Sequence, residues 1–270
     1  MEMSQNGVIT SKDNARVKAA RRVRDGRDRS LVFIEGLRLA NEALRSGLLL
    51  RECFVSEQFI SADEGVAFQK KVSAEGVAVN ICSEPVFRSL ADTMNPQGVV
   101  LISEAPGERP CEYIFRLAGP LLLLYCFEVN DPTNLGALLR TAEAAGASGV
   151  ILSPNSTWPF APKVLRASMG AAFRVAIATG VAFEEFATIA ATNDVGTAAA
   201  AAGEGTSLYD LNFRAAMAVV LGSEANGLPA KIAAACDSRV QIPMKAGVES
   251  LNLAVSGGII LYEAVRQRMA

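Results

Sequence analysis

The chain has 270 residues, half of them apolar and a fifth charged, which is ordinary for a soluble globular protein of about two domains. It contains no histidine, which excludes a Ser-His-Asp hydrolase, a Cys-His protease, a HExxH zinc enzyme and any acid or base built on imidazole. The five cysteines are widely spaced and form no CxxC pair, so neither a disulfide framework nor a metal site is predicted. We expect them to be small core residues of a reducing cytoplasm.

The chain shows no targeting or membrane signal. Its first residues lack the apolar core of a signal peptide, and the strongest apolar run, 121–127, is far shorter than the ~20 residues of a spanning helix. We therefore expect a cytoplasmic protein with no membrane partner.

The charge is distributed unevenly. The net charge is −2, but residues 10–30 hold eight lysines and arginines against three aspartates. Such a basic arm is either a contact for a phosphate backbone or a solvated amphipathic helix, and charge alone favours neither.

The first hundred residues alternate between strand-like and helix-like segments, which predicts a small α/β domain. The predicted strands are 31–35, 51–55, 77–81 and 98–102, and the predicted helices are 37–46, 62–75 and a short one after Pro85. The segment SEAPGERP (103–110) breaks all periodicity and is typical of a linker. We therefore expect one domain over 1–105 and another over 106–270.

The second part opens with LLLLYCF (121–127), a continuous apolar run typical of a strand buried on both faces of a parallel sheet. Further strands are predicted at 149–153, 173–178, 216–222 and 239–243, with helices at 134–145, 162–169, 183–190 and from Ser250 onward. This alternation predicts an α/β domain with a mainly parallel sheet. The alanine run 198–202 is predicted to be a helix end or a loop.

Ligands of such sheets bind at the carboxyl ends of the strands, but the usual fingerprints are missing. No GxGxxG and no GxxxxGK[ST] occurs, so a Rossmann dinucleotide site and a P-loop both lack their marker. Three other segments follow predicted strands and carry polar side chains.

The first segment is NDPTNLGALLRTAEAAG (130–146), in which Asp131-Pro132 or Asn134 begins a helix. Arg140 lies nearly opposite the apolar stripe of that helix, so packing does not require it. Taken alone, Asn134 is a capping residue and Arg140 a solvated cation.

The second and third segments are equally ambiguous in isolation. VVLGSEANGLP (219–229) has two glycines around Glu224, which suits either close approach to a ligand or a plain turn. IPMKAGVESLNLAVSGGIILYEAV (242–265) contains a helix start at which amides could hold a carboxylate or phosphate. Ser250 is by default its N-cap, and Asn252 a polar residue of the first turn.

Together, in order and spacing, the three segments resemble the motifs of the SpoU (TrmH) family of RNA 2'-O-ribose methyltransferases, within the SPOUT superfamily. The resemblance covers about 120–268, and residues 14–44 and 94–100 resemble the substrate-binding domain of its ribosomal-RNA branch. It implies a C-terminal SPOUT-type α/β domain with a trefoil knot and a small N-terminal L30e-like α/β domain. It also implies a homodimer in which residues of one subunit complete the site of the other.

The resemblance further implies S-adenosylmethionine as methyl donor, without a metal, and it assigns site residues. The catalytic set is Asn134, Arg140, Glu224, Ser250 and Asn252. The cofactor-binding set is Leu221, Gly222, Ile242, Met244 and Leu251. Arginine is a poor base because its pKa exceeds about 12, so we favour Arg140 as a clamp on the phosphate beside the ribose.

For RNA binding we expect cations of the basic arm and of a second basic patch. These are Arg16, Arg21, Arg22, Lys163 and Arg166.

The function expected is methylation of a ribose of large-subunit (23S) ribosomal RNA. A transfer-RNA 2'-O-methyltransferase and a catalytically silent RNA-binding factor on the same scaffold remain alternatives. An enzyme for a small nucleotide is disfavoured, since a small ligand needs neither a basic arm nor a second domain.

Overall fold

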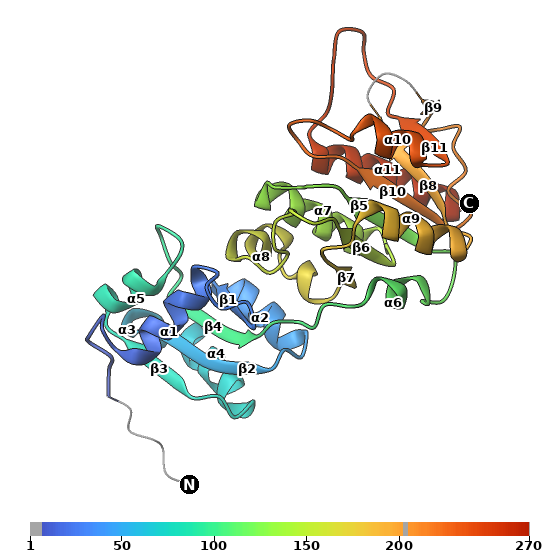
Figure 1. Ribbon diagram of the computed structural model, residues 1–270. Coiled ribbons are helices and arrows are strands. Elements are labelled where there is room, and N and C mark those ends of the chain that lie inside the picture. Colours follow the sequence, from blue (N-terminus) through green and yellow to red (C-terminus); the bar gives the residue numbers. More distant parts are fainter. Residues whose placement is uncertain (1–6, 202–204, 270) are drawn as a thin grey trace. The chain divides into compact units, whose positions relative to one another are not determined.

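The computed structural model describes residues 7–201 and 205–269. The chain divides into two compact units (Figure 1): unit 1 comprises Met1–Pro106 and Phe160–Phe173, and unit 2 comprises Gly107–Pro159 and Arg174–Ala270. The first break lies beside the linker expected from the sequence. The assignment of 160–173 to unit 1 was not expected. The periodicity of that segment predicts a helix but does not indicate which unit the helix packs against.

Unit 1 is a mixed sheet covered by helices (Figure 1). Within the described residues its strands run in the order β1-β4-β2-β3, antiparallel except for β2 and β3. Its elements are α1 (Ala15–Arg24), β1 (Leu31–Glu35), α2 (Leu37–Arg45), β2 (Leu50–Ser56), α3 (Glu57–Ile60), α4 (Asp63–Ala74), β3 (Val79–Cys82), α5 (Glu84–Leu90), β4 (Val99–Glu104), α8 (Pro162–Ser168) and a 3-10 turn at Ala171–Phe173. The predicted α/β alternation is confirmed here, but the short helix α3 and the 3-10 turn were not predicted.

The basic arm is an amphipathic helix docked on this unit. Asn14 caps α1 by accepting a hydrogen bond from the Arg16 amide, and Val17, Ala20 and Val23 are buried in the same core as Phe33. Burial of this apolar stripe fixes the helix, and its cations lie on the remaining faces.

Unit 2 is a parallel sheet with helices on its faces (Figure 1). The described strands run in the order β7-β6-β5-β10-β8-β11-β9, and every pair is parallel. Its elements are α6 (Cys111–Phe115), β5 (Leu122–Cys126), α7 (Pro132–Ala144), β6 (Gly149–Leu152), β7 (Ile177–Ala178), α9 (Phe183–Thr192), β8 (Gly196–Ala200), β9 (Thr206–Ser207), β10 (Met217–Leu221), α10 (Ala230–Ala235), β11 (Ser238–Gln241) and α11 (Leu253–Met269). The predicted parallel α/β layering is confirmed, and β5 is buried along its whole length.

Three local predictions were wrong. Ala198–Ala200 of the alanine run belong to strand β8, because pairing with β10 and β11 overrides the weak strand propensity of alanine. Ala201 follows the strand, and Ala202 lies outside the described residues. Only Ile177–Ala178 of the predicted strand 173–178 pairs, since the chain is still in a 3-10 turn at Phe173. The last helix begins at Leu253 and not at Ser250, because the Asn252 side chain accepts hydrogen bonds from the amides of Ala254 and Val255.

The cysteines are free, and all except the partly buried Cys236 are buried, as predicted. Burial raises the pKa of the Cys53 and Cys126 thiols to about 12, so these groups are protonated at neutral pH. No helix within 7–201 and 205–269 is both long and apolar enough to cross a membrane.

The sheet of unit 2 has its switch point between β5 and β10, where successive strands are added on opposite sides. Helix α7 follows β5 and packs against the terminal helix α11. Small residues permit this close packing, since a Cβ added to Gly257 would lie 2.4 Å from Cδ2 of the buried Leu138. The end of α11 is held by the Arg268 guanidinium, which donates to the carbonyls of Pro120, Leu121, Phe213 and Ala215.

We predict that Gly257→Ala destabilises the protein by about 1–3 kcal/mol, because the new methyl group overpacks a site without free space. Gly258→Ala is the matched control: its Cβ meets only Thr141 Cγ2, at 3.5 Å, and alanine favours the helix by about 0.5–1 kcal/mol. Urea unfolding of the two variants measures the difference. Equal stability of the two would contradict the close α7–α11 packing.

Candidate functional site

A cavity of about 530 Å³ lies at the carboxyl ends of the strands of unit 2. Its walls come from the residues after β10, from the segment after β11, from the end of β8 and from the start of α11. This is the edge of the sheet at which ligands of parallel α/β domains bind.

Three polar side chains from the three strand-end segments form one hydrogen-bonded chain at this cavity. Asn252 Nδ2 donates to Asn134 Oδ1 at 2.9 Å, and Asn134 Nδ2 donates to Glu224 Oε1 at 3.0 Å. The amide of Asn134 uses its acceptor on one neighbour and its donor on the other, so its orientation is fixed. The carboxylate of Glu224 keeps a second oxygen for a ligand.

Local structure holds each member of this chain in position. Asp131 caps α7 by accepting from the amides of Thr133 and Asn134, which puts Asn134 in the first turn. Asn252 caps α11 through Oδ1 while its Nδ2 reaches Asn134. The predicted capping role therefore belongs to Asp131 and Asn252, whereas Asn134 and Ser250 are not caps.

The loop that carries Glu224 depends on Gly222. A Cβ added there would lie 2.2 Å from the carbonyl carbon of Gly227, because the backbone folds back on itself. Ser223 and Gly227 exchange two backbone hydrogen bonds across this turn, and the Ser223 hydroxyl accepts from the Asn226 amide.

All five residues predicted to bind the cofactor line the cavity, and so do Asn134, Glu224, Ser250 and Asn252. Their roles stay predictions, but the structure brings them to one place. Ala200, Ala201, Ser256 and Ile260 also line the cavity and were not predicted. The alanines were missed because their run was taken for a loop; Ser256 and Ile260 lie one and two turns beyond Asn252, a spacing that was available in the sequence.

Arg140 is the one predicted catalytic residue that does not line this cavity. At about 100° per residue, the six positions from Asn134 turn α7 by about 240°, so the two side chains leave the helix on different sides. Arg140 is exposed and makes no hydrogen bond or ion pair with the described residues.

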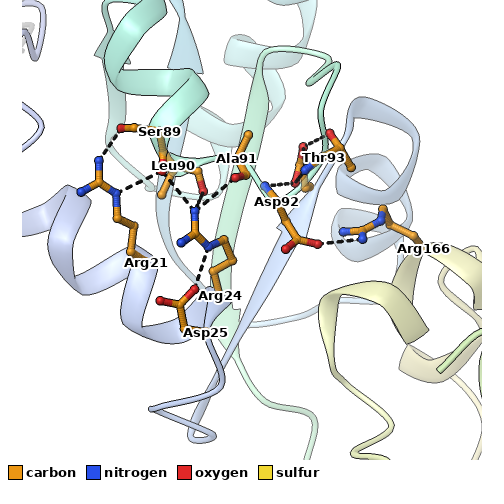
Figure 2. A network of polar contacts seen from close by, with 10 residues as sticks. Arg21, Arg24, Asp25, Ser89, Leu90, Ala91, Asp92, Thr93 and Arg166 are labelled. Carbon is orange, nitrogen blue, oxygen red and sulfur yellow. Dashed lines mark hydrogen bonds and ion pairs between the residues drawn. The ribbon is translucent and has the colours of Figure 1, made fainter. Parts of the chain in front are cut away.

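Of the five cations that we expected to bind RNA, three have partners within the protein and two are exposed. Arg16 donates to Asn80 Oδ1. Arg21 donates to the carbonyl and hydroxyl of Ser89, and Arg166 pairs with Asp92 (Figure 2). Arg22 and Lys163 are exposed. RNA contact by these residues stays a prediction, although three of the five already hold other groups of unit 1.

The cavity suits a ligand with an apolar and a polar end. Leu221, Ile242, Met244 and Leu251 give it apolar surface, while Glu224 and the asparagines supply charge and hydrogen bonds. No group of three His, Cys, Asp or Glu side chains suitable for a metal ion occurs among the residues that the structure describes.

Known proteins resemble this chain over both units. Residues 121–262 match the SpoU rRNA Methylase family, and residues 14–101 match the MRM3-like substrate binding domain. The 23S rRNA (guanosine-2'-O-)-methyltransferase RlmB of Ralstonia nicotianae is 36% identical over 203 residues, which are 74% of this chain and 82% of the relative. An uncharacterized tRNA/rRNA methyltransferase of Synechocystis is 30% identical over 97% of this chain and 94% of its own. The AdoMet-bound rRNA methyltransferase of Sinorhizobium meliloti has the same fold, with a TM-score of 0.85, 30% identity and coverage of 98% of this chain and 99% of its own.

Proposed function

Since this chain belongs to the SpoU rRNA methylase family, we propose that it methylates a ribose of large-subunit ribosomal RNA. It is an S-adenosylmethionine-dependent RNA 2'-O-methyltransferase. The observation that carries the proposal is the hydrogen-bonded chain Asn252–Asn134–Glu224, which unites all three motifs at one cavity. A silent RNA-binding factor has no need of that arrangement.

The cavity fits the methyl donor. Its volume of about 530 Å³ lies within the ~300–1,000 Å³ of small-molecule sites. Leu221, Ile242, Met244 and Leu251 would hold the apolar part of the donor, with backbone groups of the Gly222 loop beside them. When bound, S-adenosylmethionine supplies an electrophilic methyl group on a sulfonium.

The residues of the chain contribute alignment more than acid–base chemistry. Asn134, fixed between Asn252 and Glu224, offers a rigid polar edge at which a ribose can be oriented. A guanidinium keeps its proton in proteins and is a poor base, so Arg140 binds the phosphate beside the ribose and polarises the 2'-hydroxyl. The proton leaves to phosphate or water.

The substrate is large-subunit ribosomal RNA, and the relatives named as guanosine-2'-O-methyltransferases of 23S rRNA favour a guanosine. Unit 1 acts as the substrate-binding domain, a role that its family match supports. Its fold is of the L30e-like type. The chain works in the cytoplasm.

The segment between β11 and α11 passes through a loop and forms a trefoil knot, after which α11 packs against α7.

The test of the substrate is transfer of a labelled methyl group to total RNA from cells that lack the protein. The label is expected in large-subunit rRNA at one position that resists alkaline cleavage, because a 2'-O-methyl group blocks attack on the adjacent phosphate. Alkali-sensitive label would mean base methylation, and label confined to tRNA would favour the alternative substrate.

The site is completed by a second copy of the chain. Arg140 of one copy acts at the cavity of the other copy. Residues 245–252 are all exposed, as are Val255 (50%) and Tyr262 (52%) on α11, beside the helix that carries Arg140. The apolar side chains among them, Val248, Leu251, Val255 and Tyr262, are close together in the sequence, and a cluster of exposed apolar side chains favours an interface.

Heterodimers of Arg140→Ala with Asn134→Ala test this arrangement. If Arg140 acts in trans, one of the two sites in each heterodimer is intact, so the purified heterodimer is expected to regain about half the wild-type activity. If Arg140 acts in cis, both sites are damaged and the heterodimer stays as inactive as its parents. The two homodimers are the controls.

A further inference from the structure

We propose that unit 1 binds single-stranded RNA in a groove formed on both sides of Phe59 and Gln97 and bordered by the loop 93–97, and not along helix α1. The inference rests on the proposed function, since it concerns how the RNA substrate is held.

The arginines of α1 are used to hold the loop in position. Arg24 Nη1 donates to the carbonyls of Ser89, Leu90 and Ala91 at 3.0–3.2 Å, and Arg21 donates to the carbonyl of Ser89 at 3.1 Å (Figure 2). Cations suit these carbonyls because they are the unpaired acceptors at the end of α5. Two guanidinium groups of the basic arm are therefore directed at the protein itself.

The beginning of the loop is held from the other side by a buried carboxylate. Glu35, at 4% exposure, accepts from the amide of Asp92 at 2.7 Å and from the amide and hydroxyl of Thr93. Arg166 Nη2 pairs with Asp92 Oδ2 at 2.7 Å (Figure 2). A buried carboxylate needs such donors, so the path of the chain at 92–93 is strongly determined.

The end of the loop is also fixed. Gln97 Oε1 accepts from the Leu37 amide at 3.0 Å, at the start of α2. Gly98 has φ +84°, and a Cβ there would lie 2.5 Å from the Cβ of Phe59. A loop held at both ends keeps a constant shape, as a binding surface requires.

The loop displays groups that the fold does not need. Met94 is 97% exposed, and it lies with Asn95 and Pro96 along one hollow of the groove, of about 440 Å³. A second hollow, of about 390 Å³, lies across Phe59 and Gln97. The Asn41 amide in it is already bonded to the Leu37 carbonyl and the Lys71 ammonium, so its free groups come from other residues. Apolar side chains beside amides suit unstacked bases, which need a surface to stack on and partners for their edges.

Each hollow contains one available cation. Arg88 lines the first and Arg38 the second, and neither makes a hydrogen bond or ion pair with the described part of the chain. Each hollow also contains a carboxylate, Glu84 or Glu64, able to accept from the amino groups of bases. The groove thus offers two phosphate contacts and several base contacts, as expected of an RNA-binding protein with a pI of about 5.5.

The test uses the full-length double variant Arg38→Ala/Arg88→Ala, with Arg51→Ala/Lys70→Ala as the matched loss of two exposed cations of unit 1 that lie outside both the groove and the basic arm. Binding is measured with a labelled large-subunit rRNA fragment and with poly(U) at several salt concentrations. The groove variant is expected to bind about tenfold more weakly, with a salt slope reduced by about 1.4, that is 0.7 per single-strand phosphate. The control pair is expected to bind as the wild type does.

Met94→Ala is the second probe, because a residue with 97% exposure does not contribute to folding. It is expected to raise the KM for RNA and leave the affinity for S-adenosylmethionine unchanged, and ultraviolet crosslinks are expected to map to 93–97.

Loss of binding in the control pair with normal binding in the groove variant would overturn the proposal, as would a wild type that binds neither the rRNA fragment nor poly(U). If RNA binds in the groove but no alkali-resistant label forms, the proposed function fails and the groove stands.

Discussion

The hydrogen bonds that join Asn252, Asn134 and Glu224 are the constraint on which the site depends. These residues lie far apart in the sequence, yet each follows or caps an element at the carboxyl edge of one parallel sheet. Parallel strands bring their ends to one edge, so a short polar chain can connect three loops there. Each amide and carboxylate has its partner, and the cavity beside them keeps one shape.

Unit 1 uses the same principle for a different purpose. The buried carboxylate of Glu35 accepts from backbone amides at 92–93, and the guanidinium groups of Arg21 and Arg24 donate to carbonyls at 89–91. Arg166 pairs with the side chain of Asp92 in the same segment. Charged groups in such a network stabilise a loop, because removing one partner leaves another unsatisfied. A basic segment is therefore not by itself a nucleic-acid contact; its cations must first be shown to lack partners within the protein.

Much of this was predictable from the sequence. The continuous apolar run of β5 indicated a buried parallel strand, and the strand-end segments indicated where the ligand lies. Periodicity did not predict that the alanines of β8 are a strand, because that depends on pairing with β10 and β11. It also did not predict which arginines of α1 are paired, since their partners on α5 lie more than sixty residues away. The sequence indicated that packing does not require Arg140. It did not indicate that Arg140 lies outside the lining of the cavity, because the lining residues come from several segments that only the fold brings together.

Asn134 and Glu224 are expected to act as one unit in the transfer step, because the Asn134 amide donates directly to the Glu224 carboxylate. The most direct measurement is a double-mutant cycle on the single-turnover rate of methyl transfer, with Asn134→Ala, Glu224→Ala and the double variant at saturating methyl donor. Each single substitution is predicted to lower the rate about tenfold or more, and the double variant to be no slower than the worse single, a coupling of about 1 kcal/mol or more. A double variant whose loss equals the product of the two single losses would mean that the two side chains act independently.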